Sequence, residues 1–313
     1  MSRLAFVFPG QGSQSAGMGK SLYEAFPAAK KIFDEANDAL GFDIRKLSFE
    51  GPEDELNKTE NTQPALLAAS MAALEVLREK ADITPSCMAG HSLGEYTALV
   101  AAGSIRFSDA VRVVRLRGKF MQESVPQGVG KMCAILGLDL DTVQVICDSA
   151  SIDAAVAVPA NINSPEQIVI SGHAAAVDIA ANYARERGAK RVVPLQVSAP
   201  SHSPLMEKAA ERLAEELGKI EIKDPLIPVI TNVTAAPVEK ASEIRGLLKS
   251  QLTSPVRWVD IIRAMRKRDV TRIIEVGPGK VLSGLIKRIE KDIETLNLTE
   301  AGDLDRVLTA IRP

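Results

Sequence analysis

The chain has 313 residues, of which 46% are hydrophobic and 25% charged, as in a globular protein with one large or two smaller domains. A formal net charge of −2 and only 4% aromatic residues argue against nucleic-acid binding. The cysteine spacing fits neither a disulfide framework nor a zinc site, and no apolar run reaches transmembrane length, so we expect no metal, no membrane contact and a cytoplasmic protein.

The N-terminal part alternates between strand and helix patterns. Residues 4–8 form a continuous apolar run that ends at Pro9-Gly10, which is typical of a buried parallel strand. Helical patterns follow over 23–40 and 64–80. A short strand at 86–89 leads to helices at 93–102 and 108–123, and the break at 125–128 marks a boundary.

The next stretch predicts a small subdomain. Its strands are expected at 131–137, 154–161, 167–171 and 191–195, and its helices at 139–149 and 174–187. This β-α-β-β-α-β order is the ferredoxin-like arrangement.

Strands and helices then alternate again, with helices at 203–217, 241–251 and 258–268, strands at 228–232 and 272–276, and a final helical region. We therefore predict an α/β fold with a mostly parallel sheet in a large hydrolase-like domain, residues 1–126 plus 198–313. The ferredoxin-like subdomain, 127–197, is inserted into it.

The sequence Gly90-His91-Ser92-Leu93-Gly94 has the G-x-S-x-G pattern of a nucleophile elbow. It lies between the predicted strand at 86–89 and the predicted helix at 93–102. In that context the small residues allow a tight turn that exposes the serine hydroxyl, and the helix N-terminus favours negative charge nearby. The pattern predicts covalent acyl chemistry on Ser92.

A serine hydroxyl needs a base to take its proton, and the chain offers three histidines. His91 is next to Ser92, so its side chain should point away, and His173 starts a helix of the predicted insert. His202 lies where the chain returns to the large domain, which suits a general base. A surface or helix-capping role for His202 remains an alternative.

Arg117 falls on the apolar stripe of the predicted helix 108–123, whereas Arg112, Arg115 and Lys119 fall on other faces. A buried guanidinium is costly unless an anion pairs with it. Arg117 therefore either forms a buried ion pair with an acidic residue or binds a substrate carboxylate as a two-pronged donor.

The segment Gly10-Gln11-Gly12-Ser13-Gln14 follows the first strand but does not match a nucleotide-binding loop. Ser15 stands where the dinucleotide fingerprint needs its third glycine, and Gln14 stands where a phosphate loop needs its first. Such a loop can instead donate a backbone N–H to an oxyanion, with the N–H of Leu93 as the second donor.

Together these features resemble the malonyl-CoA:acyl carrier protein transacylases of type II fatty acid synthesis over nearly the whole chain. The matching segments are F-P-G-Q-G-S-Q at 8–14, T-Q-P-A at 62–65, G-H-S-L-G-E-Y at 90–96, R-G-K-F-M-Q at 117–122, N-S-P-E-Q-I-V-I-S-G at 163–172, V-S-A-P-S-H-S at 197–203, Q-L-T-S-P-V-R-W at 251–258 and E-V-G-P-G-K-V-L at 275–282.

The resemblance implies Ser92 as nucleophile and His202 as base, with His202 oriented by the backbone carbonyl of Gln251. It makes Arg117 the clamp on the malonyl carboxylate and places the oxyanion hole at the backbone N–H groups of Gln11 and Leu93. The residues expected to line the pocket are Gln63 and Asn161, with Met132 and Ser201 influencing acyl-group preference.

The implied reaction carries malonyl from malonyl-CoA to acyl carrier protein by a ping-pong mechanism and needs no cofactor. A serine hydrolase and a non-catalytic docking module are the rival interpretations. Because acyl carrier proteins are acidic, we expect a basic docking surface, with Lys190, Arg191 and the cluster at 263–272 as candidates.

Overall fold

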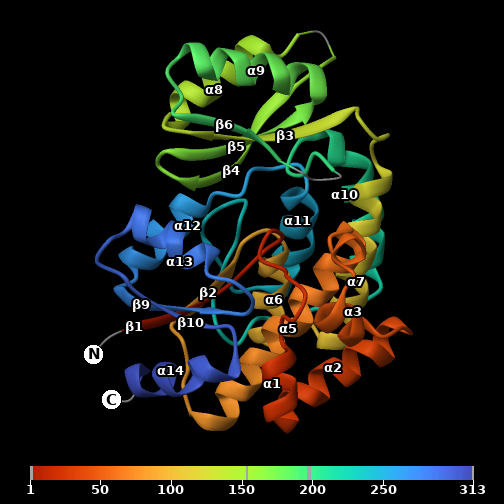
Figure 1. Ribbon diagram of the computed structural model, residues 1–313, viewed down its shortest axis with the longest axis vertical. Helices are drawn as coiled ribbons and strands as arrows, with labels where there is room; N and C mark the ends of the chain where they lie inside the picture. The colour runs from red at the N-terminus through yellow and green to blue at the C-terminus, as the bar shows by residue number, and fades with distance from the viewer. Residues whose placement is uncertain (1–2, 153, 196–198, 312–313) are drawn as a thin grey trace.

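The computed structural model describes residues 3–152, 154–195 and 199–311. It contains two sheets (Figure 1). The larger has the spatial order β10 (Glu294–Leu298), β9 (Val270–Val276), β1 (Arg3–Phe8), β2 (Cys87–Gly90), β7 (Val229–Ile230) and β8 (Pro237–Val238). Every neighbouring pair is parallel except β7 and β8. The predicted mostly parallel sheet is confirmed.

Both faces of the large sheet are covered, as the alternation along β1 requires. Phe6 and Phe8 contribute to a hydrophobic cluster on one face, and Ala5 and Val7 to a second cluster on the other. The first face carries α1 (Lys20–Ala25), α2 (Pro27–Leu40), α3 (Ile44–Glu50), α4 (Glu53–Leu56), α5 (Thr59–Lys80), α6 (Leu93–Ala101), α7 (Phe107–Glu123), α10 (Glu207–Gly218), α11 (Ala241–Gln251) and α14 (Leu304–Ile311); the second carries α12 (Trp258–Lys267) and α13 (Val281–Ile289).

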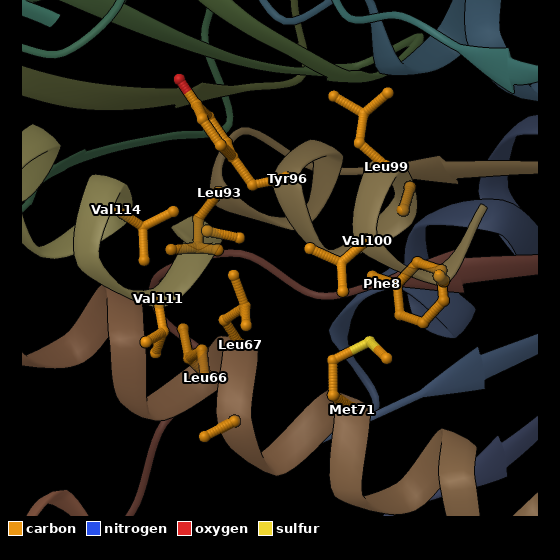
Figure 2. Packing of buried hydrophobic residues seen from close by; sticks show 14 of the residues in the cluster. Phe8, Leu66, Leu67, Met71, Leu93, Tyr96, Leu99, Val100, Val111 and Val114 are labelled. Atoms are coloured by element: carbon orange, nitrogen blue, oxygen red, sulfur yellow. The ribbon is translucent and has the colours of Figure 1, made fainter. Parts of the chain in front are cut away.

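Helix α6 contributes to the first cluster and packs against both α5 and α7, which also pack against each other. Figure 2 shows Leu93 of α6 near Val114 of α7 and Leu67 of α5. Every residue of α6 is buried. The helix that follows the elbow is therefore held rigidly by its neighbours.

The smaller sheet is antiparallel and ferredoxin-like. Its elements in chain order are β3 (Gly130–Leu136), α8 (Leu140–Ala150), β4 (Ala157–Ser164), β5 (Gln167–His173), α9 (Ala174–Glu186) and β6 (Arg191–Pro194). The spatial order is β4-β5-β3-β6. Helices α8 and α9 cover the face turned away from the large sheet (Figure 1), over a hydrophobic cluster of their own. The predicted fold class is confirmed. The exact domain boundaries at 126/127 and 197/198 stay predictions, and the second of them lies at residues 196–198, outside the described part of the chain.

Some predicted elements differ from the observed ones. The helix expected over 23–40 is two helices, because Pro27 starts α2 and holds Phe26 in an extended conformation. Helix α5 begins at Thr59 and contains Pro64, which the sequence suggested as its start. The helix expected over 203–217 begins with a 3₁₀ turn, Pro204–Met206, before α10. The final helical region is interrupted by β10, and α3, α4 and β8 were not predicted.

Among the described residues, no helix is long and apolar enough to cross a membrane.

Candidate active site

Ser92 lies at the turn between β2 and α6, as the G-x-S-x-G pattern predicts, with φ 52° and ψ −106°. The flanking glycines are needed because backbones meet there. A Cβ on Gly90 would lie 1.9 Å from the backbone of Gly94, and one on Gly94 would lie 2.1 Å from the carbonyl oxygen of Phe8. The close approach of β1, β2 and α6 therefore fixes the position of the serine.

His202 is the histidine that the fold brings to Ser92. Its Nε2 lies 2.8 Å from Ser92 Oγ, and its Nδ1 lies 2.8 Å from the carbonyl oxygen of Gln251 and 3.2 Å from that of Ser254. Carbonyl oxygens only accept, so Nδ1 carries the proton and Nε2 is free to accept one from Ser92. Burial, and then the charge of Arg117, lower the pKa of His202 to about 3, so the imidazole is neutral at physiological pH.

The other two histidines lie elsewhere. His91 Nε2 is 2.8 Å from Asn163 Oδ1, and its ring packs near Trp258. His173 Nδ1 accepts a hydrogen bond from the backbone N–H of Val156 at 3.0 Å. Neither ring is hydrogen-bonded to Ser92.

Arg117 of α7 is buried next to the serine, and its hydrogen-bond partners are neutral oxygens. Its Nη1 donates to Gln63 Oε1 at 2.7 Å, and its Nη2 donates to Gln251 Oε1 at 3.0 Å and to Ser92 Oγ at 3.2 Å. Its Nε is buried without a partner, and the guanidinium lies 5.4 Å from the centre of the Tyr96 ring. Among the described residues it forms no direct ion pair. The ion pair is thus not formed as a direct contact, although the carboxyl of Glu95 is near enough for its charge to act on the guanidinium. The guanidinium can still bind an incoming anion.

Two residues that were not predicted from the sequence are hydrogen-bonded to the backbone of Ser92. Asn232, just after β7, accepts from the Ser92 N–H through Oδ1 at 2.7 Å and donates from Nδ2 to the Gly90 carbonyl at 2.7 Å. Glu95 of α6 accepts from the Asn232 N–H at 2.9 Å and from Gln251 Nε2 at 2.8 Å. Two signals pointed to Glu95, which is the one charged residue of α6 and lies within the matched segment at 90–96. Nothing local marks Asn232.

Two backbone N–H groups are available near the hydroxyl. Leu93 is the first residue of α6, so its N–H has no acceptor within the helix. Gln11 lies in the turn after β1, and its side chain donates to Thr59 Oγ1 at 3.3 Å. Among the described residues, neither N–H makes a backbone hydrogen bond outside helices and strands. Both groups can therefore serve as donors to a ligand.

The predicted pocket residues lie in different surroundings. Gln63 is buried on α5 against Arg117. Asn161 of β4 is buried, and it pairs with Val256, in the segment between α11 and α12, through an isolated parallel bridge. Met132 packs in a small cluster with Ala134, Ala160 and Val169, and Ser201 Oγ donates to the Ala199 carbonyl at 3.4 Å.

The three cysteines are free and buried, and no cluster of metal-ligating side chains occurs among the described residues. Burial raises the pKa of the Cys147 thiol to about 12 and raises those of Cys87 and Cys133. These thiols are therefore protonated and unreactive at neutral pH.

A serine and a neutral imidazole at a strand-to-helix elbow form an acyl-transfer site, and a buried guanidinium lies beside them. In agreement, the family model for the acyl transferase domain matches residues 5–309. The chain belongs to this acyltransferase family and, within it, to the malonyl CoA-acyl carrier protein transacylases.

Its relatives of that name include the Bacillus subtilis protein, 48% identical over 100% of this chain and 98% of the relative, and the Escherichia coli K12 protein, 48% identical over 99% of each. Among solved structures, the Coxiella burnetii transacylase is 46% identical with a TM-score of 0.96, covering 99% of this chain and 97% of that one. A malonyl-transacylase solved in complex with its type II polyketide acyl-carrier protein is 47% identical with a TM-score of 0.96, covering 99% and 100%.

Proposed function

We propose that the protein transfers the malonyl group from malonyl-CoA to the phosphopantetheine thiol of acyl carrier protein, supplying extender units for fatty acid synthesis. The observation that carries this proposal is the position of Ser92 Oγ, 2.8 Å from His202 Nε2 and 3.2 Å from Arg117 Nη2. A malonyl group on that oxygen has its free carboxylate only one methylene away from the ester carbonyl. The guanidinium is therefore within reach of the carboxylate.

In the first half-reaction, Ser92 Oγ attacks the thioester carbonyl carbon as its proton passes to His202 Nε2. The N–H groups of Gln11 and Leu93 stabilise the oxyanion, and each such donor contributes about a hundredfold or more to the rate. When the intermediate collapses, the C–S bond breaks and coenzyme A leaves as a thiol with the proton from His202. The carbonyls of Gln251 and Ser254 stabilise the transient imidazolium in place of a carboxylate.

In the second half-reaction, the carrier protein's thiol gives its proton to His202 and attacks the malonyl-serine carbonyl. The ester C–O bond breaks and Ser92 regains its proton. Overall, one thioester is broken and another is formed. The free-energy change of the transfer is therefore small, and the reaction is reversible. We propose that it needs no cofactor, because neither step requires redox chemistry or phosphoryl activation.

Malonyl transfer accounts for Arg117 better than the serine-hydrolase alternative does. An esterase or thioesterase acting on uncharged acyl groups has no use for a buried guanidinium that donates to the nucleophile itself. A non-catalytic docking module would not need the Ser92–His202 hydrogen bond at all.

We propose that the carrier protein docks over a basic cleft of about 550 Å³ between the small sheet and α13. Its basic lining residues are Lys190, Arg191, Lys287, Arg288 and Lys291, and its one acidic lining residue, Glu166, pairs with Lys190. Of the other predicted cluster, Arg272 pairs with Glu294. An acidic carrier protein would be steered toward the cleft. We place the enzyme in the cytoplasm, where both substrates would be met.

The test is intact-mass spectrometry after brief mixing with malonyl-CoA in the absence of an acceptor, on the wild type and on Ser92→Ala. We expect a malonyl adduct on the wild type only, cleared by adding holo-acyl carrier protein. Free malonate accumulating without a lasting adduct would instead identify a hydrolase.

A further inference from the structure

Glu95 is a buried acidic residue that none of the transfer steps above uses. It has 1% of its surface exposed and lies on α6, where every residue is buried. A carboxyl group in such a place destabilises the fold unless its oxygens are hydrogen-bonded. One oxygen, Oε2, accepts both from the backbone N–H of Asn232 at 2.9 Å and from Nε2 of Gln251 at 2.8 Å.

The two residues that Glu95 holds in turn hold the backbone of the nucleophile. Asn232 Oδ1 accepts from the N–H of Ser92 at 2.7 Å, and Gln251 Nε2 donates to the carbonyl of Ser92 at 3.1 Å. Both polar backbone groups of Ser92 thus bind a partner of the Glu95 carboxyl, and the Ser92 carbonyl also accepts from the backbone N–H of Glu95 at 3.1 Å. Its φ of 52° is uncommon for a residue with a side chain, so these hydrogen bonds help to maintain it.

Glu95 also determines which way the Gln251 amide faces. A carboxylate oxygen only accepts, so the NH₂ group of Gln251 must point at Glu95, and Oε1 must point at Arg117, which only donates. The reversed amide would set its NH₂ against the guanidinium. The backbone carbonyl of the same residue accepts from His202 Nδ1 at 2.8 Å. The clamp and the base therefore both depend on the placement of Gln251.

We propose that Glu95 is a positioning residue for acyl transfer: its carboxylate fixes Gln251 and Asn232, and through them the backbone of Ser92, the guanidinium of Arg117 and the imidazole of His202. This inference rests on the proposed function. Within that function, Glu95 acts through Gln251 and Asn232 and does not bind a substrate itself.

The charged or titratable groups that face Glu95 are Arg117 from α7 and Tyr96, the next residue along α6. Burial raises the pKa of Glu95 to about 7, although its hydrogen bonds and the charge of Arg117 act in the opposite direction. Hydrogen bonds to an ionised carboxylate are stronger than those to the neutral acid. The network should therefore tighten as the pH rises through 7. His202 does not titrate there, because its pKa is about 3.

The experiment measures the rate of Ser92 malonylation at saturating malonyl-CoA by rapid quench and intact mass, between pH 5 and 8. The variants are Glu95→Ala, which removes the acceptor, and Glu95→Gln, which keeps one acceptor oxygen without the charge. The matched control is Thr97→Ala, because Thr97 is equally buried on α6 and its hydroxyl has no hydrogen-bond partner.

At pH 8 we expect Glu95→Ala to acylate about a hundredfold more slowly than the wild type, the usual cost of a misplaced reacting group. Its half-saturating malonyl-CoA concentration should change by less than about threefold. Glu95→Gln should come within about fivefold of the wild type, and Thr97→Ala should match it. The wild-type rate should rise about fivefold through pH 7, whereas Glu95→Gln should show no such rise.

The inference is overturned if Glu95→Ala acylates as fast as Thr97→Ala, if Glu95→Gln is as slow as Glu95→Ala, or if Glu95→Gln keeps the rise near pH 7. Should Glu95→Ala fail to fold, the pH profile of Glu95→Gln decides alone. A wild type that forms no malonyl adduct would refute the proposed function itself, whereas the three outcomes above refute only the role of Glu95.

Discussion

The backbone carbonyl of Gln251 holds His202 Nδ1 at 2.8 Å, while the side chain of the same glutamine contacts Arg117, Glu95 and the Ser92 carbonyl. One residue at the end of α11 thus links the base, the cation and the nucleophile. Because a carbonyl orients the imidazole without adding charge, His202 stays neutral in a buried site that contains a guanidinium.

Removing the guanidinium should affect malonyl transfer far more than acetyl transfer. For Arg117→Ala we expect malonyl transfer to fall about a hundredfold or more, because losing a buried charged partner costs about 3 kcal/mol or more. Acetyl transfer should fall much less or even rise, since acetyl has no carboxylate to bind. Arg117→Lys, which keeps the charge but not the planar fork, should lie in between. The measurement is kcat/KM for both acyl-CoA substrates; equal losses would assign Arg117 a structural role.

The neutral, buried His202 should make stability depend on pH in a defined direction. Its folded pKa of about 3 lies below the ordinary histidine value of 6.5, so between these values the unfolded state binds a proton that the folded state excludes. This contribution to stability is present above pH 6.5 and is lost as the pH falls. At pH 5 the loss is about 2 kcal/mol.

Urea unfolding of the wild type and His202→Ala at pH 7.5 and 5.0 isolates this contribution. The difference in free energy of unfolding between the two proteins should shift by about 2 kcal/mol against the wild type at the lower pH. The raised pKa of Glu95 makes the free energy of unfolding change with pH in the opposite direction, but this contribution is common to both proteins. An unchanged difference would mean that His202 titrates as it does in the unfolded chain.

Glu275 should prove structural rather than catalytic. Its buried carboxylate accepts from the N–H groups of Leu282 and Ser283 at the start of α13, at 3.0 and 2.8 Å, and from Asn297 Nδ2 of β10 at 3.0 Å. Glu275→Ala leaves these donors unsatisfied and should cost about 3 kcal/mol. Chemical denaturation measures this. The exposed Asp292→Ala is the control, and a loss no larger than the control's would contradict the assignment.

Reversing charges in the basic cleft should weaken carrier-protein use specifically. Lys287 and Lys291 are exposed there, and we expect Lys287→Glu with Lys291→Glu to raise the KM for holo-acyl carrier protein roughly tenfold at low salt. The KM for malonyl-CoA should stay within about twofold. Lys31→Glu, on the exposed face of α2, controls for net charge. If only Arg266→Glu with Lys267→Glu raises the KM, docking occurs over α12 instead.

The sequence was sufficient for the residues whose roles depend on local pattern. Ser92 could be predicted because an elbow needs small residues at fixed spacing, and Arg117 because helix periodicity puts it on an apolar face. The ferredoxin-like insert could be predicted from the order of its elements. The base was harder, since only the fold brings His202 to Ser92 across 110 residues.

Other features depend on tertiary contacts that no local pattern encodes. The carbonyl partner of His202 was expected only from the family resemblance. Asn232 acts because β7 lies beside β2 in the large sheet, which no feature near residue 232 reveals. Strand β10 was missed because it follows α13 within a region whose pattern is helical overall, and it forms an edge of the sheet through its pairing with β9.

Ser92 and His202 are two of the four non-glycine residues with positive φ in the described part of the chain. Each such conformation costs about 1–3 kcal/mol. The backbone conformations of the nucleophile and the base therefore lower the stability of the folded enzyme. Glycine adopts these angles freely, so Ser92→Gly should melt at a higher temperature than Ser92→Ala although both are inactive.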